Sequence, residues 1–309
     1  MPDIVIAFFA LGLFAGLMKS DLKVPASFYD TLAILLMLVL GLKGGMALHG
    51  KFQSSMLPEL LAVAGLGVLL PIVCYPVLRR MVRLSPDNAA SVAAHYGSVS
   101  AGTFAVVLTL VERAGLPVSP QTTLYLVMLE LPAIVVMLLW QRRTSGQNAQ
   151  GGVLHEALTS RGVLLLGGGV LIGYLYGPSG LEPLQTVLIG GFKTMLSIFL
   201  LEMGLCTARF CSPLPWKHWR LIVFAALAPF ALAWSGIGLA LLFNLPEGST
   251  LVLAALAASA SYIAAPAAIR AAIPGANVGL AILAALGVTF PVNVLIGIPV
   301  YQRWVHYFY

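Results

Sequence analysis

Long apolar segments, separated by short polar breaks, dominate this sequence. A transmembrane helix needs about 20 apolar residues to cross the hydrocarbon core of a bilayer. By composition 60% of the residues are hydrophobic and only 9% are charged, whereas a soluble domain carries roughly 25% charged residues. The pattern predicts an all-α polytopic membrane protein and excludes a soluble enzyme, a nucleic-acid binder and a disordered chain. Ten transmembrane helices are expected, at about 4–18, 31–48, 57–78, 88–112, 121–140, 161–177, 184–206, 217–243, 249–272 and 277–304.

The distribution of lysine and arginine over the polar breaks predicts the orientation of these helices. Basic residues concentrate in the cytoplasmic loops of membrane proteins. Three of them, Lys51, Arg113 and Arg303, fall on one side, and Lys43 and Lys193 lie within or at the ends of helices. The expected location is the plasma (inner) membrane, with both termini external. The remaining cations share the opposite, cytoplasmic side: Lys19, Lys23, Arg79, Arg80, Arg83, Arg142, Arg143, Arg161, Arg209, Lys217, Arg220 and Arg270.

A polar segment rich in glycine, serine and glutamine, from Arg142 to Gly152, divides the chain near its middle. Its composition is that of a flexible linker. We expect a first five-helix repeat over residues 1–141, a cytoplasmic linker over 142–160 and a second five-helix repeat over 161–309.

The two halves share similar features at similar spacings. Because five spans is an odd number, a second copy must be inverted in the membrane, which is a recurrent architecture of secondary transporters. We therefore expect two inverted five-helix repeats, with core and gate domains each built from both halves. The matching features are Gly41-Leu42 with Gly204-Leu205, Ser100 with Ser259, and Pro132 with Pro291.

Small hydroxyl residues and helix breakers gather near the middle of the fourth and ninth predicted helices. Such residues also permit close helix packing, which is the alternative interpretation. Opened helices, however, expose backbone N–H groups that bind an anion through the helix dipole and direct hydrogen bonds. We expect the two helices to unwind near Ser100–Gly102 and Ser261–Ala265 and to cross. The predicted substrate-binding residues are Ser100, Ala101, Gly102, Thr103, Ser259, Ala260, Ser261 and Tyr262.

Two carboxylates, Glu130 and Glu202, fall inside predicted membrane helices. A charged group in the membrane is costly unless it faces water or a partner, so each is a functional candidate. Glu130 lies two residues before Pro132, which frees a backbone carbonyl, and this setting suits a sodium ion or a proton relay. Asn293 is either a second, neutral cation ligand or a helix–helix hydrogen-bonding residue. Glu202 is expected to pair with a lysine, Lys43 or Lys193.

Two other classes of function are alternatives to a coupled transporter. An intramembrane hydrolase would use Ser98 or Ser100 as nucleophile and His95 as base, but no Gly-x-Ser-x-Gly elbow is present and we expect no enzyme activity. A passive channel, scaffold or non-coupled transporter is the other alternative. No cofactor is expected apart from a coupling ion.

The chain resembles the sodium-dependent bicarbonate transporter family, SbtA type, over nearly its whole length. The resemblance implies inverted five-helix repeats with core and gate domains, a homotrimer, bicarbonate uptake by sodium symport and a soluble PII-like regulatory partner. The residues that carry it are Gly41-Leu42-x-Gly44-Gly45-Met46-Ala47, Gly97-x-Val99-Ser100-x-x-Thr103, Leu131-Pro132-Ala133, Ala257-Ala258-Ser259-x-Ser261 and Arg270-Ala271-x-Ile273-Pro274-x-Ala276-Asn277.

The sequence also departs from the family pattern. The run Ser-Gly-Ser-Thr becomes Ser100-Ala101-Gly102-Thr103, and Ser-Ser-Ser-Asp becomes Ser259-Ala260-Ser261-Tyr262, which removes an acidic candidate cation ligand. The family's aspartate before Ile-Pro is Glu130. The linker is shorter than expected, which counts against the PII-like partner. Uptake of another small anion, or proton coupling, is the alternative within transport.

Overall fold

The computed structural model describes residues 4–144, 159, 161–211, 215–263, 265–266, 269, 273 and 275–309, and every regular element in this part of the chain is helical. Eight helices are long and apolar enough to cross a membrane, and two shorter apolar helices, Ile4–Leu17 and Glu247–Ala257, accompany them. The α-helices are α1 (Ile4–Leu17), α2 (Ala26–Leu48), α3 (Leu57–Val77), α4 (Pro86–Gly97), α5 (Ala101–Ala114), α6 (Leu124–Thr144), α8 (Arg161–Gly180), α9 (Glu182–Leu184), α10 (Phe192–Cys211), α11 (Trp219–Leu242), α12 (Glu247–Ala257), α14 (Val278–Ile282), α15 (Phe290–Val292) and α16 (Ile298–His306).

Short 3-10 and π-helical turns extend several of these helices. The π-helical segments Leu283–Thr289 and Asn293–Gly297 join α14, α15 and α16 into one apolar run over 278–306. The predicted segments agree with the observed helices to within a few residues over most of the described chain. The predicted linker lies largely outside the described residues, as does much of the expected end of the ninth helix.

Two helix pairs form one side of the molecule: α1 packs along α10, and α2 packs along α8. Glycines permit this close approach. A Cβ on Gly41 would lie 2.5 Å from the carbonyl oxygen of Leu166, and one on Gly204 would lie 2.2 Å from that of Phe9. Small residues bring membrane helices together because van der Waals packing drives helix association in lipid. The matching Gly-Leu pairs of the sequence are thus the contact points of both pairs.

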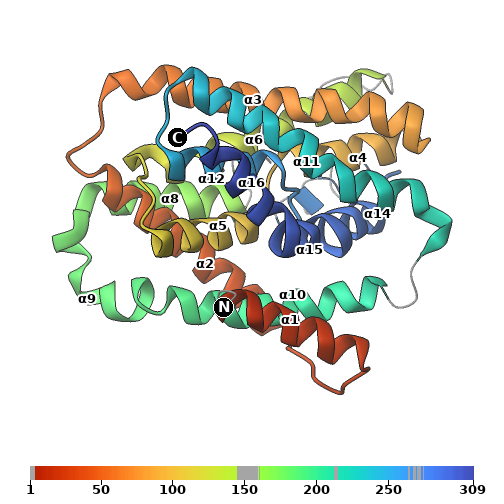
Figure 1. Ribbon diagram of the computed structural model, residues 1–309, viewed down its shortest axis with the longest axis horizontal. Coiled ribbons are helices and arrows are strands. Elements are labelled where there is room, and N and C mark those ends of the chain that lie inside the picture. The colour runs from red at the N-terminus through yellow and green to blue at the C-terminus, as the bar shows by residue number, and fades with distance from the viewer. Residues whose placement is uncertain are drawn as a thin grey trace.

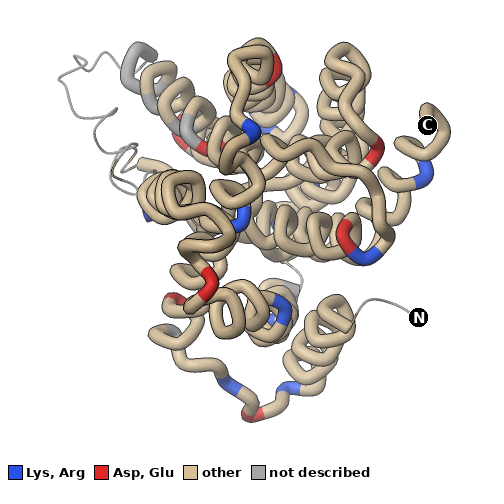
Figure 2. Tube along the Cα trace, turned by 90° about the vertical axis from the view of Figure 1, so that its left-hand side faces the viewer, with Lys and Arg blue, Asp and Glu red and all other residues tan. Residues whose placement is uncertain are grey.

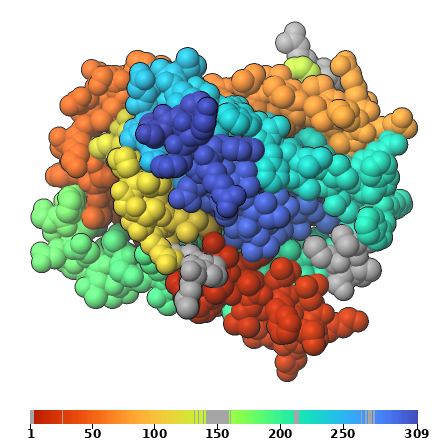
Figure 3. Space-filling model, in the orientation of Figure 1, coloured from red at the N-terminus to blue at the C-terminus, as the bar shows by residue number. Residues whose placement is uncertain are grey.

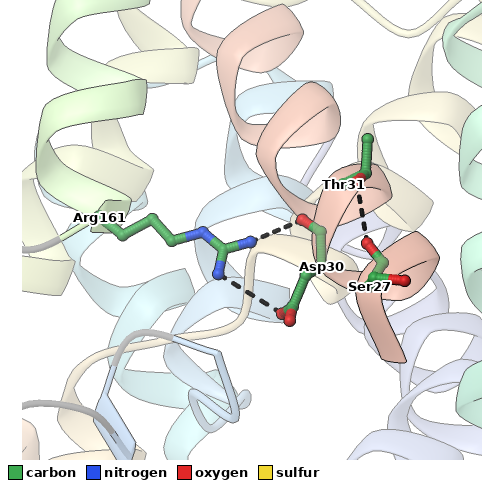
Figure 4. A network of polar contacts seen from close by, with 4 residues as sticks. All are labelled: Ser27, Asp30, Thr31 and Arg161. Atoms are coloured by element: carbon green, nitrogen blue, oxygen red, sulfur yellow. Dashed lines mark hydrogen bonds and ion pairs between the residues drawn. The ribbon is translucent and has the colours of Figure 1, made fainter. Parts of the chain in front are cut away.

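A polar contact fixes the start of α8 against the start of α2 (Figure 4). The Arg161 guanidinium donates to the backbone oxygen of Asp30 at 2.6 Å and lies 3.4 Å from a carboxylate oxygen of the same residue. Thr31 donates to the carbonyl of Ser27 one turn earlier. Because these side chains are largely exposed, the ion pair sets the register of the two helices more than it adds stability.

The remaining helices form a second group. In Figure 1, α1 and α10 run along one edge of the molecule, and α3 and α11 run along the opposite edge. Between these edges lie α4, α5, α12 and α14–α16, which contain the most completely buried residues. Every residue of α12 from Gly248 to Ala257 is buried. This buried interior keeps α5 and α12 away from the surface of the molecule.

Charged residues are sparse over the whole fold. Figure 2 shows a trace that is almost entirely uncharged, with most charged positions near helix ends and in connecting segments. Inside the helices, Lys43 pairs with Glu112 at 2.7 Å. Glu202 lies 3.6 Å from Arg209 and accepts a hydrogen bond from Cys206. The expectation that Glu202 pairs with Lys43 or Lys193 is therefore wrong. Arg209 stands seven residues after Glu202, two helical turns along α10, which a longer side chain can span.

Candidate functional site

The fourth predicted helix is broken in two, between α4 and α5. Ser98, Val99 and Ser100 form the break, and Val99 adopts a positive φ of 39°, which is uncommon for a β-branched residue. Ser100 then acts as the N-cap of α5, because its side-chain oxygen accepts a hydrogen bond from the Thr103 N–H at 3.1 Å. The break therefore lies earlier than the expected Ser100–Gly102. Gly102 is inside the first turn of α5 and does not open it.

The ninth predicted helix breaks as well. The helix α12 ends at Ala257, and the backbone from Ser259 to Ile263 is not helical. This break also begins before the expected Ser261–Ala265, because Ser259 turns its hydroxyl back onto the carbonyl of Leu256 at 2.8 Å and so ends the helix. Ser261 accepts a hydrogen bond from the N–H of Ala265 at 3.3 Å, as Ser100 does for Thr103.

The two breaks are hydrogen-bonded to each other. The N–H of Ser100 donates to the hydroxyl oxygen of Ser259 at 2.8 Å. The N–H of Ser261 donates to the carbonyl oxygen of His95, near the end of α4, at 2.7 Å. Each break thus satisfies a backbone group of the other, which unwound backbone in a buried setting requires. Ser100 and Ser259, which the sequence places at matching positions of the two halves, are therefore in direct contact.

A small hollow lies beside this crossing. Its volume is about 10 Å³, room for about one water molecule. Its lining includes Ser100, Ala101, Ser261 and Tyr262 from the breaks, together with Glu130 of α6. Met37 of α2 lines it as well, and a neighbouring hollow of similarly small volume, about 10 Å³, adds Phe199 of α10. The crossing therefore faces helices α2 and α10 across these two hollows.

Glu130 is the carboxylate of this hollow. Its side chain is 5% exposed, and its Oε2 atom has no hydrogen-bond partner among the described residues. Buried polar groups are almost always paired, and a lone buried carboxylate is costly. Other buried polar atoms near the crossing also have no partner there: His95 Nε2, Ser98 Oγ, Thr103 Oγ1 and Tyr262 Oη. This concentration of unpaired polar atoms is what an ion-binding region would show.

The predicted hydroxyls are engaged in different ways. Ser100 and Ser261 use their oxygens as acceptors for backbone N–H groups, which leaves each hydroxyl hydrogen free to donate. Ser259 both accepts from Ser100 and donates to Leu256, so its capacity to donate is used. Ala260, also predicted, is 2% exposed and does not line the hollow. Thr103 lies one turn into α5, where it does not line the hollow either.

Tyr262 fills the space beside the start of α5. A Cβ on Gly102 would lie 2.0 Å from the Tyr262 hydroxyl oxygen, so this glycine is what admits the tyrosine. The ring also packs edge-on against Phe290, with centroids 5.4 Å apart. The departure from the family pattern at Tyr262 and the glycine at position 102 are therefore two parts of one packing arrangement.

Asn293 hydrogen-bonds the backbone next to the break in the ninth predicted helix. Its amide nitrogen donates to the carbonyl of Ala258 at 2.8 Å, and its amide oxygen accepts from the Tyr301 hydroxyl at 2.8 Å. The side chain is fully buried and is not among the residues that line the hollow. The structure thus places Asn293 at a helix–helix hydrogen bond and does not bring it together with Glu130 in the hollow.

His95 makes one hydrogen bond through its ring, between Nδ1 and the carbonyl of Ser91 at 2.7 Å. Its other ring nitrogen meets no serine hydroxyl in the described part of the chain. The nucleophile and base of a hydrolase need such a contact, so the geometry offers no support for that alternative.

A further buried carboxylate, Glu59, was not singled out from the sequence. It accepts hydrogen bonds from the amide of Gln121 at 2.9 Å and from the hydroxyl of Tyr125. Gln121 and Tyr125 are four residues apart, on one helical face, which was the available signal. Glu59 looked like an ordinary first-turn acid of α3. Because two donors hold it, it differs from the unpaired Glu130.

A comparison with curated proteins gives no match. The profile of the Na+-dependent bicarbonate transporter superfamily matches residues 4–306, which is nearly the whole chain. The chain therefore belongs to the Na+-dependent bicarbonate transporter superfamily.

Proposed function

We propose that this protein takes up bicarbonate by symport with sodium at the crossing of its two broken helices. The observation that carries the proposal is the hollow itself: two hydrogen-bonded helix breaks and an unpaired carboxylate meet at one buried point. Membership of the superfamily supports transport of this ion pair. The hydrolase alternative would need a serine in contact with His95, and among the described residues His95 Nε2 has no hydrogen-bond partner.

We further propose that the chain consists of two inverted five-helix repeats, counted as ten spans. The support is reciprocal packing. The first helix of the first half, α1, packs on α10, the second long helix of the second half. In the same way α8, the first helix of the second half, packs on α2 of the first half. The Ser100 N–H also donates to the Ser259 hydroxyl at the crossing, and the two serines occupy matching positions of the two halves. In such a fold α1, α2, α8 and α10 would form the gate, and the remaining helices would form the core.

The proposed anion site is the start of α5. The N–H groups of Ala101 and Gly102 belong to the first turn, where a helix supplies no carbonyl partner. They are joined by the free hydroxyl hydrogens of Ser100 and Ser261. A helix N-terminus of this length carries a partial positive charge that favours an anion. Glu130, across the hollow, would hold the sodium ion beside the bound anion.

Removing a hydroxyl from this site should weaken uptake. We expect Ser100→Ala and Ser261→Ala each to raise the bicarbonate concentration for half-maximal uptake about tenfold, because a hydrogen bond to a charged group contributes roughly 1.5–3 kcal/mol. Ser235→Ala is the matched control, since that hydroxyl lies outside the hollow and donates to the Leu232 carbonyl in α11. Unchanged uptake in both site variants would place the anion elsewhere.

The direct test uses purified protein in liposomes. Labelled bicarbonate should accumulate when sodium is high outside, and this accumulation should stop when the sodium gradient is dissipated by an ionophore. Chloride, nitrate and formate in place of unlabelled bicarbonate measure selectivity by competition. Uptake of a different anion alone would revise the substrate, and uptake without any gradient would identify a non-coupled transporter.

The proposed orientation in the plasma membrane has the linker in the cytoplasm and both termini outside. The contact of Arg161 with Asp30 supports it, because it brings two segments assigned to the cytoplasm to the same end. In a cysteine-free background, Ser145→Cys should resist an impermeant thiol reagent in intact cells, whereas Gln53→Cys should react. Labelling at position 145 from outside would invert the assignment.

Assembly is also proposed. We expect a homotrimer, measurable as the mass of the purified protein in detergent. A soluble PII-like regulator, if one binds, would be recovered on the cytoplasmic face. The shorter linker argues against that partner.

A further inference from the structure

Helices α3 and α11 run along the edge of the molecule opposite α1 and α10 (Figures 1 and 3). An open apolar groove lies between them. It encloses about 480 Å³. Its walls include exposed apolar side chains such as Val73 and Leu227, and its floor includes the buried residues Cys74 and Leu232. The groove is therefore shaped and lined to accept a flexible hydrocarbon chain.

A basic hollow of about 430 Å³ continues from one end of this groove. The two share Val82, Trp219 and Arg220, and the basic hollow adds Arg83 and Lys217. Among the described residues, Arg83, Lys217 and Arg220 have no carboxylate partner at ion-pair distance. The nearby Asp87 is turned towards Gly275. Three cations without a carboxylate partner among the described residues therefore surround one end of the apolar groove.

The shared residues suit the boundary between lipid chains and headgroups. The ring of Trp219 is 53% exposed, and the Arg220 guanidinium lies 5.4 Å from its centroid. Tryptophan is enriched at this level of membranes, and arginine keeps its charged end towards the headgroups. The apolar part of the site therefore lies at the depth of acyl chains, and the charged part lies at the depth of phosphates.

We propose that this combined groove is a binding site for one anionic phospholipid. Its acyl chain would lie between α3 and α11, and its phosphate would contact Arg83, Lys217 and Arg220. The charge complementarity selects this occupant: a second copy of the chain would need acidic residues to match the cations, and a zwitterionic lipid would gain less from them. Basic pockets between membrane helices bind anionic headgroups in this way. Because α3 and α11 come from opposite halves, the lipid would bridge them.

The test is native mass spectrometry of the purified protein with equal amounts of phosphatidylglycerol and phosphatidylcholine. We expect preferential retention of phosphatidylglycerol. The variant Arg83→Gln/Lys217→Gln/Arg220→Gln should reduce its retention at least about tenfold, since each cation near an anionic headgroup contributes about 1 kcal/mol. The matched control Lys19→Gln/Lys23→Gln/Lys51→Gln removes three exposed cations elsewhere and should retain it. If the triple variant does not fold, Arg220→Gln alone serves.

A second pair of variants tests the apolar part. Ala231→Trp fills the groove and should abolish retention, whereas Ala10→Trp, on the exposed face of α1, should not. Equal retention of the two lipids by the wild type would overturn the proposal. Retention that survives Ala231→Trp but is displaced by inorganic phosphate would also overturn it, because the basic hollow would then be a phosphate site. Dissociation of an oligomer by Ala231→Trp, without lipid release, would instead make the groove a subunit interface and contradict the lipid.

Discussion

Replacing Gly173 by leucine is expected to leave little folded protein. A Cβ at this position would lie 2.4 Å from the Leu42 carbonyl oxygen and 3.0 Å from the Gly45 Cα atom. Both are backbone atoms, so no side chain can move aside, and α8 would have to separate from α2. Overpacking a well-packed interior costs about 1–3 kcal/mol and sometimes more. Here the contact is between main chains along a whole helix pair, so we expect the upper end of that range.

The measurement is the thermal midpoint of the purified protein in detergent, followed by size exclusion. Gly168→Leu is the control on the same helix, because a Cβ there would meet nothing within 4 Å. It should express and melt like the wild type. If Gly173→Leu did so as well, α2 and α8 would not be packed through these glycines, and the reciprocal pairing that supports the inverted repeats would lose its basis.

The helix boundaries were predictable because the physical signal is strong. Lipid accepts only backbone that is hydrogen-bonded within the protein, so long apolar runs must be helical. The break in the ninth predicted helix was harder to place. The helix α12 has only 11 residues and would not be recognised alone as a membrane span. Its position follows from the serine at its end and from its partner break in the other half.

Five of the predicted residues line the hollow, whereas the geometry of the helix breaks was not predictable from the sequence. The spacing of Ser100 and Ser259 indicated equivalent positions, and the structure shows them in hydrogen-bond contact. The exact position of the breaks depended on capping by Ser100 and on the return of Ser259 to Leu256, which are choices between competing local hydrogen bonds. Neither choice leaves a distinctive pattern in a single sequence.

Contacts across the fold were not predictable from one chain. Met37 and Phe199 line the hollows as ordinary apolar residues of α2 and α10, and nothing in their local sequence distinguishes them. From the sequence, Asn293 was equally a cation ligand or a helix–helix hydrogen-bonding residue, because a buried amide can do either. Only the positions of Ala258 and Tyr301 show which groups its amide contacts.

Glu130→Gln is expected to abolish sodium-driven uptake while leaving the fold intact. The glutamine has nearly the same shape, and the carboxylate forms no ion pair among the described residues that the change would break. Loss of the charge removes the compensation that a bound sodium ion needs in a buried hollow. Sodium-driven uptake should fall at least about tenfold, the effect of roughly 1.4 kcal/mol. Glu112→Gln, at a half-exposed carboxylate paired with Lys43, is the matched control and should retain uptake.

The same variant distinguishes sodium from proton coupling, because sodium and proton gradients can be imposed separately on the liposomes. Anion symport brings its own negative charge into the hollow, so one protein carboxylate can suffice for a sodium ion, even with Tyr262 where the family has an aspartate. On this basis wild-type uptake follows the sodium gradient and is lost in Glu130→Gln. If Glu130 carries a proton instead, wild-type uptake will follow an imposed pH gradient and ignore sodium, and the variant will lose that response. Full sodium-driven uptake in Glu130→Gln would make the residue structural and move the coupling site away from this hollow.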